Sequence, residues 1–358
     1  TPLYSSAASD VYKRQIADTY RLKRRIHEPK RDSTGPVLTP EKPWEGDSVA
    51  PVRIVLDPER GAFRMWYEVY DHAVSKQRKA LRAGLAGNVG EPQPAYICYA
   101  ESRDGVRWDR PALGIYAHEA GANNICFKGF SAAQGCSVHH QPQAPPDERW
   151  LLVNLDWFSV QSGGVCLAYS PDGIRWAYKE HKPVVFGESD TRNCMVYNTE
   201  RGVYMLYMRA WHAAAVGWIS EWVGGRGQPR HVDLRQAQAK KLADEQMAKE
   251  GGHPAGHKNP RRRIAYCESE DLKNWTESQI ILTPDELDTD DFYGMLPFRY
   301  ADYYLGQLMV HDDVEAETLD IELAFSRDGV AWSRLPDRPK VIPTGEPGDP
   351  DGYMVIPA

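Results

Sequence analysis

A short motif that occurs four times constrains the fold of this chain more than any other feature. Each copy starts with serine, has aspartate at its third position and tryptophan at its seventh, and follows a strand-like run. The copies are Ser102–Trp108, Ser170–Trp176, Ser269–Trp275 and Ser326–Trp332. Asp-Gly, present in all but the third copy, favours a hairpin because Gly accepts a positive φ and Asp tolerates it. The tryptophan opens the return strand, where we expect it to be buried within or between blades. Four copies of one hairpin predict a repeat of antiparallel blades rather than a doubly wound parallel sheet.

The runs around these hairpins divide the chain into blades. The first two strands are predicted at residues 49–56 and 63–69 in blade one, at 136–140 and 150–155 in blade two, and at 193–197 and 203–208 in blade three. Blade four begins near residue 290 with its second strand at 304–310, and a fifth blade begins near residue 348 with a strand at 353–356. The predicted fold class is therefore all-β, a five-bladed β-propeller with an incomplete fifth blade. We expect the missing strands to lie beyond the given sequence, with N-terminal strands as the alternative.

The repeat also sets the domain organisation. Residues 36–358 form the propeller and residues 1–35 an N-terminal tail, of which 1–15 look like translated adapter sequence. A long polar loop is predicted at 71–94. An insertion at 211–260 in blade three has helical composition over 233–250. We expect both segments to form walls or lids of a pocket, with ordinary variable loops as the alternative.

Composition narrows the classes of partner. The formal net charge is −7, which argues against a nucleic-acid partner, because proteins that bind nucleic acid usually carry a basic surface. No apolar run approaches 18 residues, so no membrane span is predicted. No secretory signal is recognisable, and the cellular location and oligomeric state stay open. The six cysteines form no C-x-x-C pair and are predicted to be buried free thiols.

Several short runs resemble a known superfamily. They are Lys42–Glu45 (KPWE), Arg64–Tyr67 (RMWY), the four hairpins and Phe292–Met295 (FYGM). With these runs the chain resembles the five-bladed β-propeller glycosidases of glycoside hydrolase families 32, 43 and 68, and is most similar to the uncharacterised group labelled family-32-N-terminal-like. It lacks the Trp-Met-Asn-Asp-Pro-Asn-Gly, Arg-Asp-Pro and Glu-Cys motifs of true family 32 enzymes. The resemblance therefore implies a fold and a reaction class, and site residues must be assigned by position.

In propellers of this type the ligand lies where the inner strands begin, and the third-to-outer hairpins point to the opposite face. The hairpin aspartates are therefore predicted to be structural: Asp104, Asp172, Asp271 and Asp328. The acids at inner-strand starts are Asp47 with Glu45, Asp190, Asp290 with Asp291, and Asp351 with Asp349. Glycoside hydrolysis needs two carboxyl groups, one protonated and one ionised, and crowded carboxylates raise one another's pKa. Each acid alone is more often a turn or cap residue, but the recurring set favours a site.

Position then suggests roles for these residues. Asp47 is the predicted base or nucleophile, Asp190 an orienting or transition-state-stabilising carboxylate, and Asp291 the general acid. The predicted substrate-binding residues lie at inner-strand starts or at the ends of second strands. They are Glu45, Glu68, Arg209, His311 and Asp351. For Arg209, a structural ion pair is the alternative.

No cofactor is predicted, with a central calcium ion as the alternative left open. His139 and His140 on the inner strand of blade two could bind such a cation, although packed or solvated histidines are the more ordinary interpretation.

Three functions are consistent with these patterns. The leading hypothesis is a glycoside hydrolase-like propeller that cleaves a small or terminal sugar residue from an oligosaccharide or glycoside. The alternative is a catalytically silent carbohydrate-binding propeller, which would explain the missing family motifs. A propeller that serves as a scaffold for protein partners is the third, and the ring of inner acids argues against it.

Overall fold

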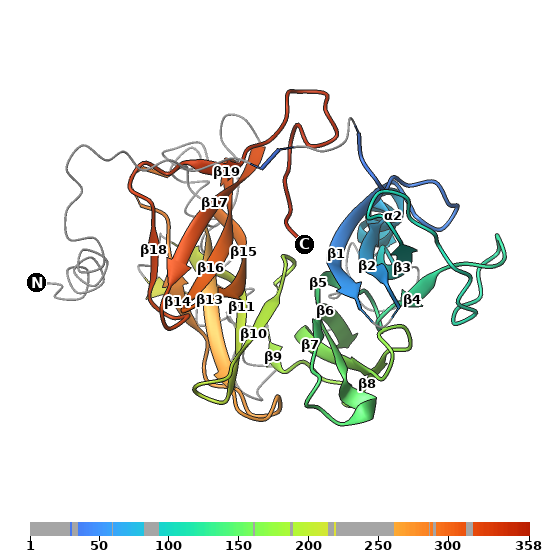
Figure 1. Cartoon of the computed structure of the whole chain (residues 1–358), viewed down its shortest axis with the longest axis horizontal. Helices are drawn as coiled ribbons and strands as arrows, with labels where there is room; N and C mark the ends of the chain where they lie inside the picture. The colour runs from blue at the N-terminus through green and yellow to red at the C-terminus, as the bar shows by residue number, and fades with distance from the viewer. Residues whose placement is uncertain are drawn as a thin grey trace, which may run out of the picture.

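Nearly all the regular structure of the described residues is β, arranged as four antiparallel sheets (Figure 1). The computed structural model describes residues 29–30, 35–58, 60–81, 93–159, 162–186, 189–213, 218–219, 261–285, 287–288, 291–312 and 318–358. In each sheet the first three strands pair in chain order, which is the propeller blade that the hairpin repeat predicted.

The four sheets are the four blades. Blade one contains β1 (Ser48–Asp57), β2 (Ala62–Tyr70), β3 (Ala95–Ser102) and β4 (Ile125–Phe127). Blade two contains β5 (Gln134–His140), β6 (Trp150–Ser159), β7 (Ser162–Ser170), β8 (Ala177–Tyr178) and β9 (Val185–Phe186). Blade three contains β10 (Cys194–Asn198), β11 (Val203–Ala213), β12 (Trp218–Ile219), β13 (Arg261–Ser269) and β14 (Gln279–Leu282). Blade four contains β15 (Asp291–Tyr300), β16 (Tyr303–Asp312), β17 (Thr318–Ser326), β18 (Trp332–Arg334) and β19 (Lys340–Ile342). A helix, α2 (His72–Leu81), follows β2, and a 3₁₀ turn, η1 (Pro146–Glu148), precedes β6.

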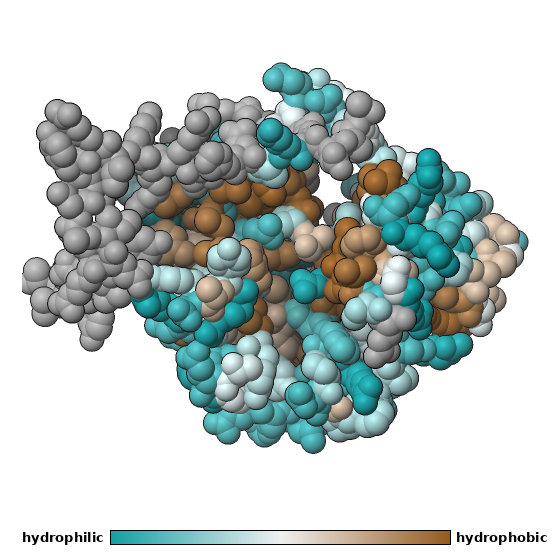
Figure 2. Space-filling model, viewed as in Figure 1, coloured by the Kyte–Doolittle hydropathy of each residue, from teal (hydrophilic) through white to brown (hydrophobic). Residues whose placement is uncertain are grey.

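Consecutive blades pack face to face in chain order. β1 contacts β5, β5 contacts β10, and β10, β11 and β13 contact β15. A buried apolar cluster fills each of these three interfaces, with Trp66 in the first, Leu206 in the second and Phe292 in the third. Figure 2 shows apolar surface on both sides of the hollow near the middle of this face. The core is thus distributed between blades, and the inner ends of the strands are left to form a central site.

The repeated hairpins are held by a fixed set of side-chain hydrogen bonds. In blade one, Ser102 Oγ accepts the backbone N–H of Gly105 at 2.9 Å, and Asp104 Oδ1 accepts those of Val106 and Arg107 at 2.8 Å. These backbone donors hold the pKa of Asp104 below its usual value. The carboxylates of the other three hairpins accept the equivalent backbone donors: Asp172, Asp271 and Asp328. The hairpin aspartates are therefore structural, as the sequence predicted.

Two hairpins are also tied to the preceding blade. Trp66 Nε1 on β2 donates to the carbonyl oxygen of Gly173, and the Tyr207 hydroxyl on β11 donates to that of Gly329 at 2.8 Å. The hairpin tryptophans are less uniformly buried than predicted. Trp176 and Trp275 are buried, whereas Trp108 and Trp332 are half-buried.

The C-terminal segment corrects the prediction of a fifth blade. Residues 353–356 were predicted to begin a further sheet, but they run parallel to the start of β17. The Leu319 N–H donates to the Tyr353 carbonyl oxygen at 2.8 Å, and the Val355 N–H donates to the Leu319 carbonyl oxygen at 3.0 Å. Residues in this part of the chain therefore extend blade four, and the described residues form four blades rather than five.

The two predicted insertions are only partly described. The first ten residues after Asp71 form α2 instead of the predicted polar loop, and residues 82–92 lie outside the described part. The insertion at 211–260 begins as the end of β11 and as β12, and its predicted helix at 233–250 lies outside the described residues, as does most of the N-terminal tail.

All six cysteines are buried free thiols, as predicted. No helix in the described part of the chain is long and apolar enough to cross a membrane.

Candidate active site

A pocket of about 350 Å³ lies where the inner strands of the four blades begin. Blade one contributes β1, the end of β2 and the start of α2; blade two contributes the start of β5; blades three and four contribute the residues around the starts of β10 and β15. The C-terminal segment adds one apolar residue. The lining residues are Ser48, Ala50, Glu68, Tyr70, His72, Gln134, Gly135, Asp190, Thr191, Arg192, Tyr293 and Ile356. The predicted convergence of strand starts therefore produces a pocket, and two of its lining side chains are carboxyl groups.

Glu68, on β2, is one of these carboxyl groups. The backbone N–H of Cys136 donates to Glu68 Oε2 at 3.4 Å, and Arg192 Nη1 lies 3.8 Å from the same oxygen. Burial raises the pKa of Glu68; the Arg192 charge opposes this shift, and the nearby Asp190 adds to it. The side chain therefore keeps a proton to a higher pH than an ordinary glutamate does.

Asp190 is the second carboxyl group of the pocket, and it is ion-paired. Its partner is the Arg209 guanidinium, which is buried, while the Asp190 carboxylate is 37% exposed. The Arg209 backbone N–H donates to Ser189 Oγ at 3.0 Å, and its guanidinium lies 4.5 Å from the centroid of the Tyr293 ring. Arg209 thus connects blades three and four and fixes the Asp190 carboxylate at the pocket wall. The predicted residue Arg209 lies behind the pocket, in the ion pair that was its alternative interpretation.

Asp291 is buried just outside the pocket. It accepts the Arg262 backbone N–H and Nη1, both at 2.7 Å, and His311 Nδ1 lies 4.0 Å away. Burial raises the pKa of Asp291, but the interactions with His311 and Arg262 outweigh burial and hold the pKa below its usual value. An ionised carboxylate fixed in this way does not hold the proton that a general acid must deliver. His311 packs edge-on against Tyr293, with ring centroids 5.8 Å apart.

Asp47 lies at the rim of the pocket, next to Ser48. His72 Nδ1 is 2.7 Å from Asp47 Oδ1, and both side chains are more than half exposed. The hydrogen bond from His72 is the main cause that lowers the pKa of Asp47. His72 lines the pocket whereas Asp47 does not, so the pair presents an ionised carboxylate beside the opening.

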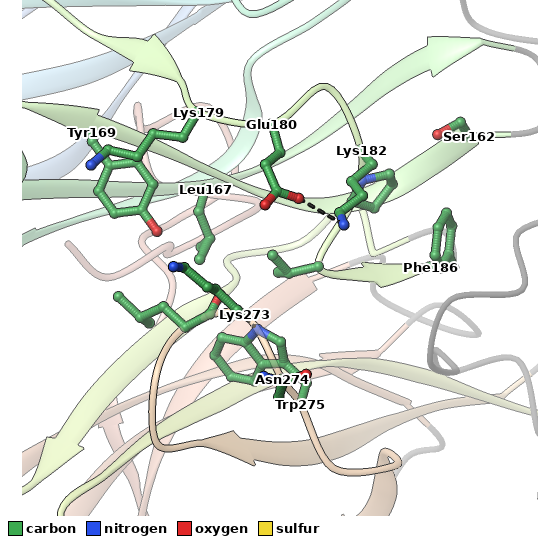
Figure 3. A pocket seen from close by; sticks show the side chains of 13 residues that line it. Ser162, Leu167, Tyr169, Lys179, Glu180, Lys182, Phe186, Lys273, Asn274 and Trp275 are labelled. Atoms are coloured by element: carbon green, nitrogen blue, oxygen red, sulfur yellow. Dashed lines mark hydrogen bonds and ion pairs between the residues drawn. The ribbon is translucent and has the colours of Figure 1, made fainter.

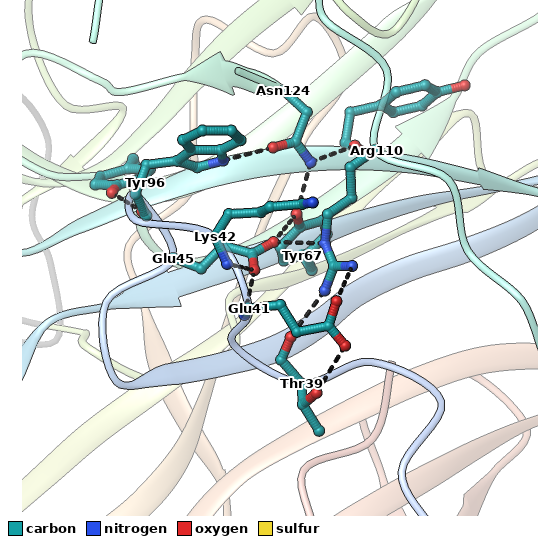
Figure 4. Close-up of polar contacts among 10 residues, drawn as sticks. Thr39, Glu41, Lys42, Glu45, Tyr67, Tyr96, Arg110 and Asn124 are labelled. Atoms are coloured by element: carbon teal, nitrogen blue, oxygen red, sulfur yellow. Dashed lines mark hydrogen bonds and ion pairs between the residues drawn. The ribbon is translucent and has the colours of Figure 1, made fainter. Parts of the chain in front are cut away.

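Glu45 does not reach the pocket. Its carboxylate is fully buried and accepts the Tyr67 hydroxyl at 2.6 Å and Arg110 Nε at 2.7 Å (Figure 4). The backbone N–H groups of Glu41 and Lys42 donate to its other oxygen at 2.8 and 2.9 Å. The network anchors the segment before β1, and it has a structural rather than a substrate-binding geometry.

Asp351 is also outside the pocket lining. It belongs to a turn in the C-terminal segment, where its carbonyl oxygen accepts the Gly345 N–H at 3.0 Å.

Of the two histidines on β5, His139 is half-buried and His140 is exposed. His139 Nε2 lies 2.7 Å from Ser137 Oγ, and burial lowers the pKa of His139 to about 3. The His140 ring packs on Trp150, with centroids 4.5 Å apart. The more ordinary interpretation of these histidines therefore fits the structure. Among the described residues, no group of three or more His, Cys, Asp or Glu side chains could hold a metal ion.

Sequence reasoning missed Arg192, which joins three blades at the pocket. Its Nη1 donates to the Cys136 carbonyl oxygen at 3.1 Å, and its Nη2 donates to the Pro51 carbonyl oxygen. It also faces Glu68, so one guanidinium connects blades one, two and three. The run Asp190-Thr191-Arg192 at an inner-strand start was the available signal, because Arg192 stands two residues after a predicted acid.

Three inner strands carry a β-bulge close to the pocket. The register shifts between Pro51 and Arg53 on β1, between Gln134 and Ser137 on β5, and between Phe292 and Gly294 on β15. Tyr293 and Gly135 fall within two of these bulges and line the pocket. A bulge re-aims the side chains beside it, which explains why Tyr293 rather than Asp291 faces the pocket.

No protein-family model and no curated protein matches the sequence. Solved structures do match in fold. A glycoside hydrolase has a TM-score of 0.52 and 10% identity, over 98% of this chain and 86% of that one. The β-1,2-mannobiose phosphorylase from Listeria innocua has a TM-score of 0.51 and 12% identity, over 89% and 84%.

The fructofuranosidase from Schwanniomyces occidentalis has a TM-score of 0.47 and 13% identity, over 88% of this chain. The match spans about half, 51%, of that enzyme's chain. The two matches with TM-scores above 0.5, at 10% and 12% identity, show a shared fold alone, and they do not distinguish between the glycosidase families named above.

Proposed function

We propose that the protein cleaves a glycosidic bond in the central pocket, with Glu68 as the proton donor and Asp190 as the ionised carboxyl group. The observation that carries the proposal is the contrast between these two side chains in one pocket. Burial raises the pKa of Glu68 even though Arg192 Nη1 lies 3.8 Å away, whereas the partly exposed Asp190 carboxylate forms a close ion pair with Arg209. Pairs of carboxyl groups in such unlike environments are the usual acid and base of glycoside hydrolysis.

The chemistry follows from these positions. Glu68 would donate its proton to the departing glycosidic oxygen. Asp190 would either attack the anomeric carbon or take a proton from the attacking water. The separation of the two carboxyl groups decides between these routes and hence between retention and inversion. Arg192 would position Glu68, and Arg209 would hold Asp190 in place.

The pocket also suggests the size of the substrate. Its volume of about 350 Å³ is near the lower end of the range for ligand pockets, about 300–1,000 Å³. The lining includes two tyrosines, Tyr70 and Tyr293, which offer rings and hydroxyl groups to a sugar. A small or terminal sugar residue, which is the substrate predicted from sequence, would fit a pocket of this volume.

The test is turnover of a panel of aryl glycosides and oligosaccharides by the wild type and by Glu68→Gln and Asp190→Asn. Each substitution should lower the rate about 10²–10⁴-fold. Asp302→Asn is the matched control, because Asp302 is an exposed carboxylate in the turn between β15 and β16; it should keep full activity. Full activity of Glu68→Gln would remove the proposed proton donor.

The same experiment tests the roles assigned from sequence. Asp47→Asn and Asp291→Asn examine the predicted base and general acid, and loss of turnover in those two variants alone would return the chemistry to them. Sugar binding by the wild type without turnover of any substrate would favour the catalytically silent carbohydrate-binding propeller.

A further inference from the structure

A second cavity, of about 510 Å³, lies between blades two and three, away from the central pocket. It runs beside β7 from Ser162 to Tyr169, and the blade-three hairpin closes its other side (Figure 3). This cavity, called the groove below, and the central pocket have no lining residue in common. A ligand here would therefore leave the central pocket unoccupied.

The groove carries a local excess of positive charge on an acidic protein. Three lysines and one glutamate line it, whereas the chain as a whole has a formal net charge of −7. Lys179 is ion-paired with Glu148, and Lys182 Nζ lies 2.7 Å from Glu180. Among the residues that the structure describes, the amine of Lys273 has no ion-pair partner. An unneutralised ammonium group in a groove favours an anionic ligand group.

Two other polar groups of the groove can form hydrogen bonds with the hydroxyl groups of a ligand. The Tyr169 hydroxyl has no hydrogen bond to any described residue, and the Asn274 side chain uses its amide nitrogen on Asp271 Oδ2 at 2.8 Å, which leaves its carbonyl oxygen as an acceptor. Figure 3 shows the Tyr169 hydroxyl and the Lys273 amine directed into the same space as the Glu180 carboxylate. Donors, acceptors and one cation thus converge in one groove.

The floor of the groove is apolar. Leu167, Phe186, Leu272 and Trp275 are largely buried and line its base. A mainly apolar lining with a few placed polar groups is typical of small-molecule sites. A pyranose ring offers one apolar face and a rim of hydroxyl groups, and a uronic acid adds a carboxylate.

We propose that this groove is a second carbohydrate site, which binds an acidic sugar residue with its carboxylate on Lys273 and its hydroxyl groups on Tyr169 and Asn274. The site involves no bond cleavage. It would retain a carboxylate-bearing glycan on the protein whether or not the central pocket acts on that glycan.

The test is titration calorimetry of the full chain with digalacturonic acid and with neutral galactobiose, at about 0.15 M salt to suppress unspecific attraction. The wild type should bind the acidic disaccharide saturably and the neutral one at least tenfold more weakly. Lys273→Gln should weaken binding of the acid about tenfold or more, as expected for loss of a hydrogen bond to a charged group. Arg107→Gln is the matched control, because Arg107 is a highly exposed cation on the equivalent hairpin of blade one. It should bind like the wild type.

Three results would overturn the proposal: no binding of digalacturonic acid by the wild type, equal binding of the neutral disaccharide, or equal weakening in Lys273→Gln and Arg107→Gln. The central pocket is distinguished by Glu68→Gln. Loss of binding in Glu68→Gln together with full binding in Lys273→Gln would place the acidic sugar in the central pocket instead. Retained binding in Glu68→Gln supports the groove even if the proposed hydrolysis fails.

Discussion

Replacement of Glu45 by glutamine separates a structural carboxylate from a substrate-binding one. The Glu45 carboxylate is fully buried and accepts four donors, of which the charged one is Arg110 Nε at 2.7 Å. Breaking a buried ion pair from one side costs about 3–5 kcal/mol, because the remaining charge stays buried without its partner. Arg110 also donates to the Thr39 carbonyl oxygen at 2.8 Å, so some of its hydrogen bonding survives. We therefore expect Glu45→Gln to lower the free energy of unfolding by about 3 kcal/mol.

The assay is urea unfolding monitored by tryptophan fluorescence, with turnover measured at urea concentrations where both proteins are folded. Glu41→Gln is the control. Glu41 lies 3.2 Å from the same guanidinium but is 59% exposed, so its loss should cost less than about 1 kcal/mol. The folded Glu45→Gln variant should turn over substrate like the wild type. Unchanged stability together with lost sugar binding would refute this reasoning and restore Glu45 to the site.

Two further predictions concern stability. Tyr207→Phe should lower the free energy of unfolding by about 0.5–1.5 kcal/mol in the same urea assay, because the hydrogen bond from Tyr207 to the Gly329 carbonyl oxygen is lost while Trp332 Nε1 still donates to that oxygen at 2.9 Å. A loss no larger than that caused by Tyr197→Phe, at an exposed tyrosine, would contradict this prediction. Because the pKa of folded Asp291 is lowered, its stabilising contribution is present above the unfolded value of about 4 and is lost as pH falls through the folded pKa. The thermal midpoint should therefore fall more steeply below about pH 4 in the wild type than in Asp291→Asn. If the midpoints of the two proteins fall in parallel, the ion pair of Asp291 does not cause the loss of stability at low pH.

The blade repeat could be predicted from sequence because its determinants are local. The serine and aspartate of each hairpin form hydrogen bonds within the same seven residues, so the sequence motif alone is enough to predict the hairpin. In the strands beside the hairpins, apolar and polar residues alternate or apolar residues follow one another, and this pattern indicates where each strand begins and ends approximately. The convergence of inner-strand starts then follows from the propeller arrangement, and a pocket lies at these starts.

The direction of each acidic side chain could not be predicted, because it depends on register. Side chains alternate along a strand, so a shift by one residue moves a carboxyl group to the opposite side. The bulge between Phe292 and Gly294 lies immediately after Asp291, and Asp291 is paired with Arg262 outside the pocket. Glu68, whose strand β2 pairs with β3 without a register shift, reaches the pocket instead. Sequence analysis placed Glu68 among the substrate-binding residues, but its raised pKa depends on burial, which outweighs the opposing charge of Arg192 and which no local pattern reveals.

The C-terminal segment explains why Asp351 is not among the carboxyl groups that line the pocket. Residues 353–356 have the composition of an inner strand, yet their pairing partner is Leu319 of blade four. Ile356, next to this pairing, lines the pocket together with Ser48 and Ala50 of blade one, while Asp351 lies in the preceding turn. An apolar side chain therefore lies where the sequence predicted a substrate-binding acid. Ile356 and Glu68 line the same pocket, and apolar surface in a pocket disfavours an ionised carboxyl group, in keeping with the raised pKa of Glu68.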